Sequence, residues 1–244
     1  MTAFAIAFAL SSIAALLWLA WNPTNGKALA DSKTEAAFRV RFDAGLVSLA
    51  GGFLGARITF LLSHWSYYTA HPLEMVQIWQ GGLSWSGAAA GALLALYLYA
   101  RITKHPFWDL ADALAGPTAL LSIGLWIGCL IDGSAYGIGG QTGSMAIASA
   151  DIFGVISLRW PTLAVGASCS ALILLGVFLL RDRLPRSGLL ASIALALFSV
   201  LMLALSFTRG DPVGMLWGLR LDTLGSTVIL AAALAGLVLR IWRK

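Results

Sequence analysis

Seven apolar runs, each about as long as a lipid bilayer is thick, divide this chain of 244 residues. A helix that crosses the hydrocarbon core needs about 20 mostly apolar residues. The runs are about twice as long as the strands of a transmembrane β-barrel, and they do not alternate as such strands do. We therefore predict an all-α integral membrane protein with seven transmembrane helices in a single membrane domain, residues 1–244. The predicted spans lie near residues 2–21, 43–63, 82–100, 109–131, 162–180, 188–207 and 221–239.

The composition supports the same class of protein. Hydrophobic residues make up 59% of the chain and charged residues 11%, whereas soluble domains carry roughly 25% charged residues. This composition excludes a soluble enzyme, a nucleic-acid-binding protein and a disordered chain. Membrane lipids are the expected partners, and nucleic acid is not.

The distribution of basic residues predicts the orientation. Four are expected on the external side or within a span: Arg57, Arg159, Arg209 and Arg220. The other twelve fall in connections that alternate spans place on the opposite face, and positive charge is retained in the cytoplasm. The amino end is therefore predicted outside and the carboxyl end cytoplasmic. These twelve are Lys27, Lys33, Arg39, Arg41, Arg101, Lys104, Arg181, Arg183, Arg186, Arg240, Arg243 and Lys244.

Two charged residues, Arg57 and Asp112, fall within predicted spans. A charge at that depth costs at least about 2.5 kcal/mol on insertion scales, so each must face a partner, a cavity or a headgroup. One interpretation is an ion pair that holds two helices together. The other is that the Arg57 guanidinium binds a lipid phosphate, which it suits in geometry and charge.

Small residues and cysteines occupy the interiors of the predicted spans. Glycines four residues apart lie on one face of a helix and allow another backbone to approach closely. We expect these pairs to pack within the molecule. Cys129 and Cys169 are expected to be small buried hydrophobic residues, and their spacing predicts neither a disulfide nor a metal site. The glycine pairs are Gly51 and Gly55, Gly87 and Gly91, and Gly124 and Gly128.

A series of short motifs resembles a known family. In order, they are Gly55-Ala56-Arg57, Tyr67-Tyr68, His71-Pro72-Leu73-Glu74, Ile78-Trp79-Gln80-Gly81-Gly82-Leu83-Ser84, and weaker segments at residues 110–115, 131–137, 159–162 and 207–209. This order resembles the prolipoprotein diacylglyceryl transferase family. The resemblance implies a seven-span bundle in the bacterial cytoplasmic (inner) membrane. It also implies transfer of a diacylglyceryl group from phosphatidylglycerol to the thiol of a lipobox cysteine.

The chain departs from that family where the family carries its catalytic groups. A histidine, two arginines, an asparagine and a glutamate are replaced by Ser86, Trp126, Cys129, Ser134, Trp160, Met202 and Ser206 in this chain, the family's set including a further histidine and glutamate. Gly166 likewise stands where the family has a glutamate, and Asp132 where it has an asparagine. Removing one preorganised electrostatic donor typically costs about 2.7–4 kcal/mol of transition-state stabilisation, so we expect little of the family reaction to remain.

The resulting prediction is a non-catalytic, lipid-binding or structural subunit that packs against partner membrane proteins. The retained polar residues Arg57, Arg159, Arg209 and Ser84 are expected to bind a lipid headgroup. No cofactor is expected beyond a bound phospholipid such as phosphatidylglycerol. The alternative is an active phosphatidylglycerol–prolipoprotein diacylglyceryl transferase in which Asp132 acts as the base. A transporter or channel is less favoured, because the spans carry few facing charges.

Overall fold

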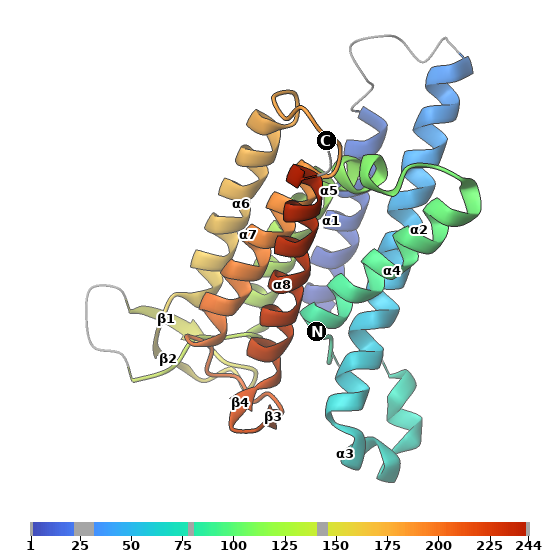
Figure 1. The fold of residues 1–244 in the computed structure, drawn as a ribbon. Helices are drawn as coiled ribbons and strands as arrows, with labels where there is room; N and C mark the ends of the chain where they lie inside the picture. The colour runs from blue at the N-terminus through green and yellow to red at the C-terminus, as the bar shows by residue number, and fades with distance from the viewer. Residues whose placement is uncertain (1, 22–31, 78–80, 141–145, 243–244) are drawn as a thin grey trace.

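Long helices that run alongside one another make up most of the protein (Figure 1). The computed structural model describes residues 2–21, 32–77, 81–140 and 146–242. Lys27, Trp79, Arg243 and Lys244, which entered the orientation and resemblance arguments, lie outside the described residues. The helices are α1 (Thr2–Trp21), α2 (Ser32–Ser63), α3 (Trp65–Ala70), the 3₁₀ helix η2 (Pro72–Val76), α4 (Trp85–Thr103), α5 (Phe107–Asp132), α6 (Thr162–Leu180), α7 (Leu189–Ser206) and α8 (Leu221–Trp242).

Five of the described helices are long and apolar enough to cross a bilayer: the Glu35–Ser63 part of α2, and α5, α6, α7 and α8. α1 contributes a shorter apolar stretch, Phe4–Leu19. The prediction of a mostly helical, multi-pass membrane protein is therefore confirmed. The described residues also include four short strands, which form two hairpins that the sequence analysis did not predict.

Helix bounds differ most from the predicted spans at the amino ends of α2 and α4. α2 begins at Ser32, eleven residues before the predicted span, and Glu35 and Arg39 form an i,i+4 ion pair on its exposed first turns. Apolarity locates only the lipid-facing part of a helix, so a polar extension is missed. α4 begins later than predicted because Gly81 and Gly82 adopt φ values of 88° and 81°, which are incompatible with a helix.

The expected glycine packing joins α2 to α4. A Cβ atom added at Gly55 would lie 2.8 Å from the Cα atom of Gly91 and would also overlap the carbonyl oxygen of Gly87. A Cβ atom at Gly51 would lie 2.8 Å from the Gly91 carbonyl oxygen. The two backbones are thus in direct contact, and the glycine pairs serve packing within the chain. Gly128 brings α5 equally close to Ala7 and Phe4 of α1.

A second core lies among α5, α6 and α7. Its buried side chains include Trp126, Leu163, Phe198 and Leu205. Cys129, Cys169 and Met202 are half-buried against this core, and both cysteines are free thiols. Apolar side chains on three different helices therefore hold the carboxyl-terminal half together.

Both hairpins lie at the same end of the molecule as α3 (Figure 1). β1 (Ile147–Ala150) pairs antiparallel with β2 (Ile156–Arg159), and β3 (Met215–Leu216) pairs antiparallel with β4 (Leu219–Arg220). The stretch after α5 links them: Gly139 bridges to Arg159, and Gly137 bridges to Arg209. We refer to this assembly of connections as the hairpin end.

Replacing Gly55 by alanine is expected to separate α2 from α4, because the new methyl group meets backbone atoms that cannot rotate away. Overpacking of this kind typically costs about 1–3 kcal/mol. The thermal unfolding midpoint in detergent should therefore fall. Gly176→Ala is the matched control, since a Cβ atom at Gly176 in α6 meets nothing within 4 Å; equal midpoints for the two variants would refute close packing at Gly55.

Candidate functional site

Arg57, near the end of α2, is surrounded by backbone carbonyl groups of the following connection. Its Nε donates to Met75 O at 3.2 Å, and Nη2 donates to Glu74 O at 2.9 Å. Nη1 donates to Gly81 O at 2.6 Å and to Gly82 O at 3.2 Å. The residue is only 6% exposed. The guanidinium therefore closes the connection between α2 and α4 onto the end of α2.

The predicted Arg57–Asp112 ion pair is wrong. Asp112 instead accepts hydrogen bonds from the backbone N–H groups of Gly188 at 2.6 Å and Ala191 at 2.8 Å. These groups belong to the first turn of α7, whose N–H groups have no partner within the helix. Arg57 lies near the end of α2 and Asp112 near the start of α5, and these points are at opposite ends of the bundle (Figure 1). Span membership alone does not reveal this separation.

Arg159 lies at the end of β2 and is buried. Its Nη2 donates to Asp151 Oδ2 at 2.9 Å, Nε donates to Ser149 O at 3.3 Å, and the guanidinium lies 4.6 Å from the centre of the Tyr136 ring. Asp151 also accepts from the backbone N–H of Val155 at 3.0 Å. The expected headgroup ligand thus holds the β1–β2 turn in place.

Arg209 belongs to a cluster of two arginines and two aspartates at the base of the second hairpin. Arg209 Nε donates to Asp211 Oδ1 at 2.8 Å, and its Nη1 lies 3.7 Å from Asp222 Oδ2. Arg220 donates to Asp222 Oδ1 at 3.1 Å and lies 3.4 Å from Asp211 Oδ1. Burial tends to lower the pKa of Arg209, but the Asp211 hydrogen bond and the charges of Asp211 and Asp222 raise it above its ordinary value. The cluster is fully ionised and carries no net charge.

Ser84 and Ser86 lie at the start of α4. The Ser84 hydroxyl group caps the helix by accepting from Gly87 N at 3.5 Å, and it lies 3.1 Å from the Ser86 hydroxyl group. A Cβ atom at Gly225 of α8 would lie 2.5 Å from the Ser86 Cβ atom. At Ser86, where the resemblance implies a histidine, α8 is therefore already in contact with the small side chain.

Trp126 is buried in α5 against α6. A Cβ atom added at Gly166 would lie 2.5 Å from Trp126 Cδ2 and 2.8 Å from Cε3. The indole therefore occupies the space that a side chain at residue 166 would need. The resemblance implies an arginine at the first position and a glutamate at the second, so a large apolar residue and a glycine replace a charged pair.

Other substituted positions also have structural contacts. Ser206 donates to Leu203 O at 2.7 Å and accepts from Thr223 Oγ1 at 2.8 Å, which joins α7 to α8. The Trp160 backbone N–H donates to Ile138 O at 3.0 Å, which joins β2 to the stretch after α5.

Ser134 and Asp132 follow the same helix. Ser134 N donates to Cys129 O at 3.1 Å and ends α5, and Gly133, at φ 69°, provides its left-handed C-cap. Asp132 is the last residue of α5. Its predicted role as a base stays a prediction, as does headgroup binding by Ser84 and the three arginines.

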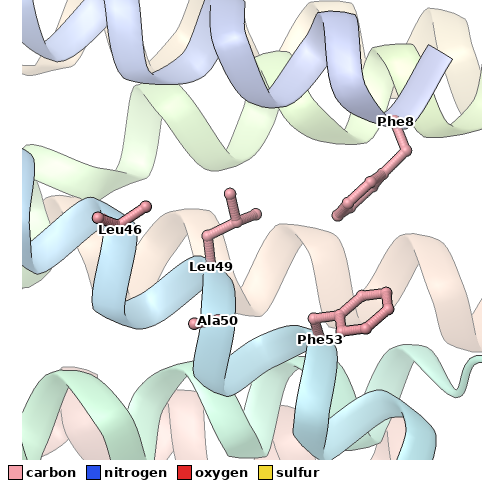
Figure 2. A pocket seen from close by; sticks show the side chains of 5 residues that line it. All are labelled: Phe8, Leu46, Leu49, Ala50 and Phe53. Atoms are coloured by element: carbon pink, nitrogen blue, oxygen red, sulfur yellow. The ribbon is translucent and has the colours of Figure 1, made fainter. Parts of the chain in front are cut away.

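An apolar cleft separates parts of α1 and α2. Phe8 of α1 and Leu46, Leu49, Ala50 and Phe53 of α2 line a volume of about 260 Å³ (Figure 2). The Phe8 and Phe53 rings stand 6.0 Å apart at one end of this lining. Its side chains are all hydrocarbon, so the cleft suits an acyl chain or another apolar group.

The aspartates that bind the arginines at the hairpin end were missed as site residues. Asp151, Asp211 and Asp222 each contact an arginine. A repeated pattern could have identified two of them, since Arg209-Gly210-Asp211 and Arg220-Leu221-Asp222 are both Arg-x-Asp segments. The pairing of the two segments depends on the β3–β4 hairpin, which brings them together.

These features define a multi-pass helical membrane protein whose arginines at the hairpin end bind groups of the same chain. A family model described as prolipoprotein diacylglyceryl transferase matches residues 1–240. The chain belongs to the prolipoprotein diacylglyceryl transferase family.

Curated relatives carry the name phosphatidylglycerol–prolipoprotein diacylglyceryl transferase. The protein of Hydrogenovibrio crunogenus is 28% identical over 201 residues, which cover 79% of this chain and 73% of the relative. That of Symbiobacterium thermophilum is 36% identical over 130 residues, 52% of this chain and 45% of the relative. That of Trichormus variabilis is 38% identical over 97 residues, and this match spans 34% of the relative's length.

Asp112→Ala should destabilise the protein, because two backbone N–H groups of α7 lose their acceptors. Leaving buried donors unsatisfied costs about 1–3 kcal/mol, and the thermal unfolding midpoint in detergent should fall accordingly. Asp112→Asn keeps one carbonyl acceptor and should lose less. Asp182→Ala provides the control, since that side chain is 82% exposed; a midpoint for Asp112→Ala equal to this control would contradict the capping role.

Gly166→Ala should also lower the unfolding midpoint, because the added methyl group overlaps the Trp126 indole. The cost is expected at about 1–3 kcal/mol. In a Trp126→Leu background the same substitution should cost less, since the ring is gone. A double-mutant cycle measures the coupling, and additive effects of the two substitutions would rule out the contact.

Proposed function

We propose that this chain is a non-catalytic family member of the bacterial cytoplasmic membrane, which binds phospholipid and packs against other transmembrane subunits. The observation that carries this proposal is the Trp126 indole standing against Gly166. Family catalysis needs cations to stabilise a departing phosphate. An indole has no positive charge, and it fills the volume that a catalytic carboxylate at residue 166 would occupy.

The state of the retained arginines supports the same proposal. Arg57 donates to four backbone carbonyl groups, Arg159 is paired with Asp151, and Arg209 is paired with Asp211. A lipid phosphate could bind any of them only by displacing these partners. Removing one member of a buried pair leaves an uncompensated charge, which is strongly unfavourable. These residues therefore serve to hold the hairpin end together.

Lipid binding is assigned to the apolar cleft between α1 and α2. Its hydrocarbon lining gives an acyl chain the same contacts that it has in the bilayer, and Leu46 is about half exposed at its edge. Phe53 is one helical turn before Arg57, about 6 Å along the axis of α2. A chain held there would place its headgroup towards the hairpin end.

The membrane topology belongs to the same proposal. α1, α2, α4, α5, α6, α7 and α8 are taken as seven spans, with the amino end and the hairpin end outside. Loop arginines and lysines then lie mainly in the cytoplasm, as the positive-inside rule requires. Arg181, Arg183 and Arg186 all fall in the connection between α6 and α7, at the end opposite the hairpins.

An active transferase is the second candidate. Its support is the convergence of Arg209 and Arg220 with Asp211 and Asp222, together with the printed names of the relatives. Activity would require the cluster to open, so that an arginine could bind phosphate and a carboxylate could accept the thiol proton. The thiolate would then form a carbon–sulfur bond as the glycerol carbon–oxygen bond to phosphate breaks.

A reconstituted transfer assay separates the two candidates. The full chain in phosphatidylglycerol vesicles is mixed with a lipobox peptide that contains one cysteine, and mass spectrometry follows the peptide. We expect no diacylglyceryl adduct above protein-free vesicles, whereas the Symbiobacterium thermophilum relative should provide the positive control.

Adduct formation by this chain would contradict the non-catalytic proposal. In that case Arg209→Gln should abolish the product if the cluster is the catalytic site. Asp182→Ala is the control for reconstitution, because this exposed side chain lies in the connection between α6 and α7.

A further inference from the structure

Two turns at the hairpin end present large apolar side chains to their surroundings. Phe153, between β1 and β2, is 81% exposed, and Trp217, between β3 and β4, is 87% exposed. Ile152, Val155 and Ile156 are also exposed beside Phe153. Water is a poor environment for such side chains, so both turns call for an apolar partner.

The backbone at Trp217 shows that this residue is not chosen for the turn. β3 and β4 are joined by a two-residue turn in which Trp217 has φ 53° and Gly218 has φ 78°. Such type I′ turns favour Asn-Gly, because both central residues need positive φ. A bulky aromatic residue in this conformation is strained, and strain of this kind is retained where the residue has another role.

The turn between β1 and β2 is held rigid from inside. Asp151 Oδ1 accepts from the backbone N–H groups of Phe153 at 2.9 Å and Val155 at 3.0 Å. Arg159 binds the other oxygen of the same carboxylate. The loop therefore presents Phe153 in one preformed arrangement.

Charge at the hairpin end is balanced close to both turns. Residues 152–158 and 212–219 contain no charged side chain. Arg159 is neutralised by Asp151, and Arg209 and Arg220 by Asp211 and Asp222. The contact that these turns make is therefore apolar, with no preference for an acidic or basic partner.

The hairpins are connected directly to candidate spanning helices. β4 ends at Arg220 and α8 begins at Leu221, so Trp217 is four residues, at most about 14 Å of extended chain, from the start of α8. β2 ends at Arg159, and α6 begins at Thr162. Both turns can therefore reach the headgroup layer of the bilayer that α6 and α8 enter.

We propose that Phe153 and Trp217 insert into the interface between headgroups and acyl chains on the hairpin side, and anchor the two hairpins to the membrane. Tryptophan is enriched at this depth because its ring is amphipathic. The neutral stems allow insertion into zwitterionic and anionic lipid alike. This role is independent of whether the chain transfers a diacylglyceryl group.

Site-specific labels test the proposal in the full chain. Phe153→Cys and Trp217→Cys are made with Cys129 and Cys169 replaced by alanine, labelled with an environment-sensitive dye and reconstituted in phosphatidylcholine vesicles. We expect blue-shifted emission, quenching by headgroup-spin-labelled lipid and protection from aqueous iodide. Adding phosphatidylglycerol or raising the salt concentration should change none of these readouts.

Asp182→Cys is the matched control, because this exposed residue lies at the opposite end in a charged connection. Its dye should be quenched by iodide and not by the spin-labelled lipid. If dyes at residues 153 and 217 behave like this control, the proposal is overturned. Protection that disappears when the protein is diluted with excess lipid would also overturn it, since a second copy would then be the partner.

Trp217→Asn separates anchoring from a structural role. An Asn-Gly turn suits the observed backbone better than Trp-Gly, so the unfolding midpoint in detergent should equal or exceed that of the wild type. A lower midpoint would assign Trp217 to packing of the hairpin and contradict the proposal.

Discussion

Every polar group that this fold removes from water must find its partner within the chain, because lipid offers none. Asp112 illustrates the constraint: its carboxylate, placed in a helix, accepts the N–H groups at the start of α7. Arg57 does the reverse and donates to carbonyl groups at the other end of the bundle. The two charged residues that were most conspicuous in the sequence therefore join separate pairs of elements.

The same constraint shapes the hairpin end. Its arginines are bound by aspartates that lie a few residues away along the chain, and this makes the extramembrane connections compact and neutral. A family catalytic site needs cations free to meet a phosphate. In this chain, satisfied ion pairs and the Trp126–Gly166 contact occupy the positions where the family resemblance implies such groups. The proposed non-catalytic function rests on that exchange of reactive groups for packing.

Close backbone packing complements the polar contacts. The glycines of α2 and α4 allow the helices to touch, which increases dispersion contacts where no hydrophobic driving force separates lipid from protein. Exposed apolar side chains on the helices then need no further explanation in a bilayer. Phe153 and Trp217 differ because they project from turns beyond the helices, and this position motivates the proposed interfacial anchor.

The sequence by itself determined the class of protein, the approximate positions of the helices and the family, because apolarity and short motifs are local properties. It also indicated the close approach of helices at Gly51, Gly55, Gly87 and Gly91. Only the tertiary structure decided which charges meet. Asp112 pairs with α7 instead of Arg57, and Arg209 meets Asp222 through a hairpin that apolarity does not predict. Partner choice depends on which ends of distant helices are neighbours, and hydropathy along one chain carries no information about that.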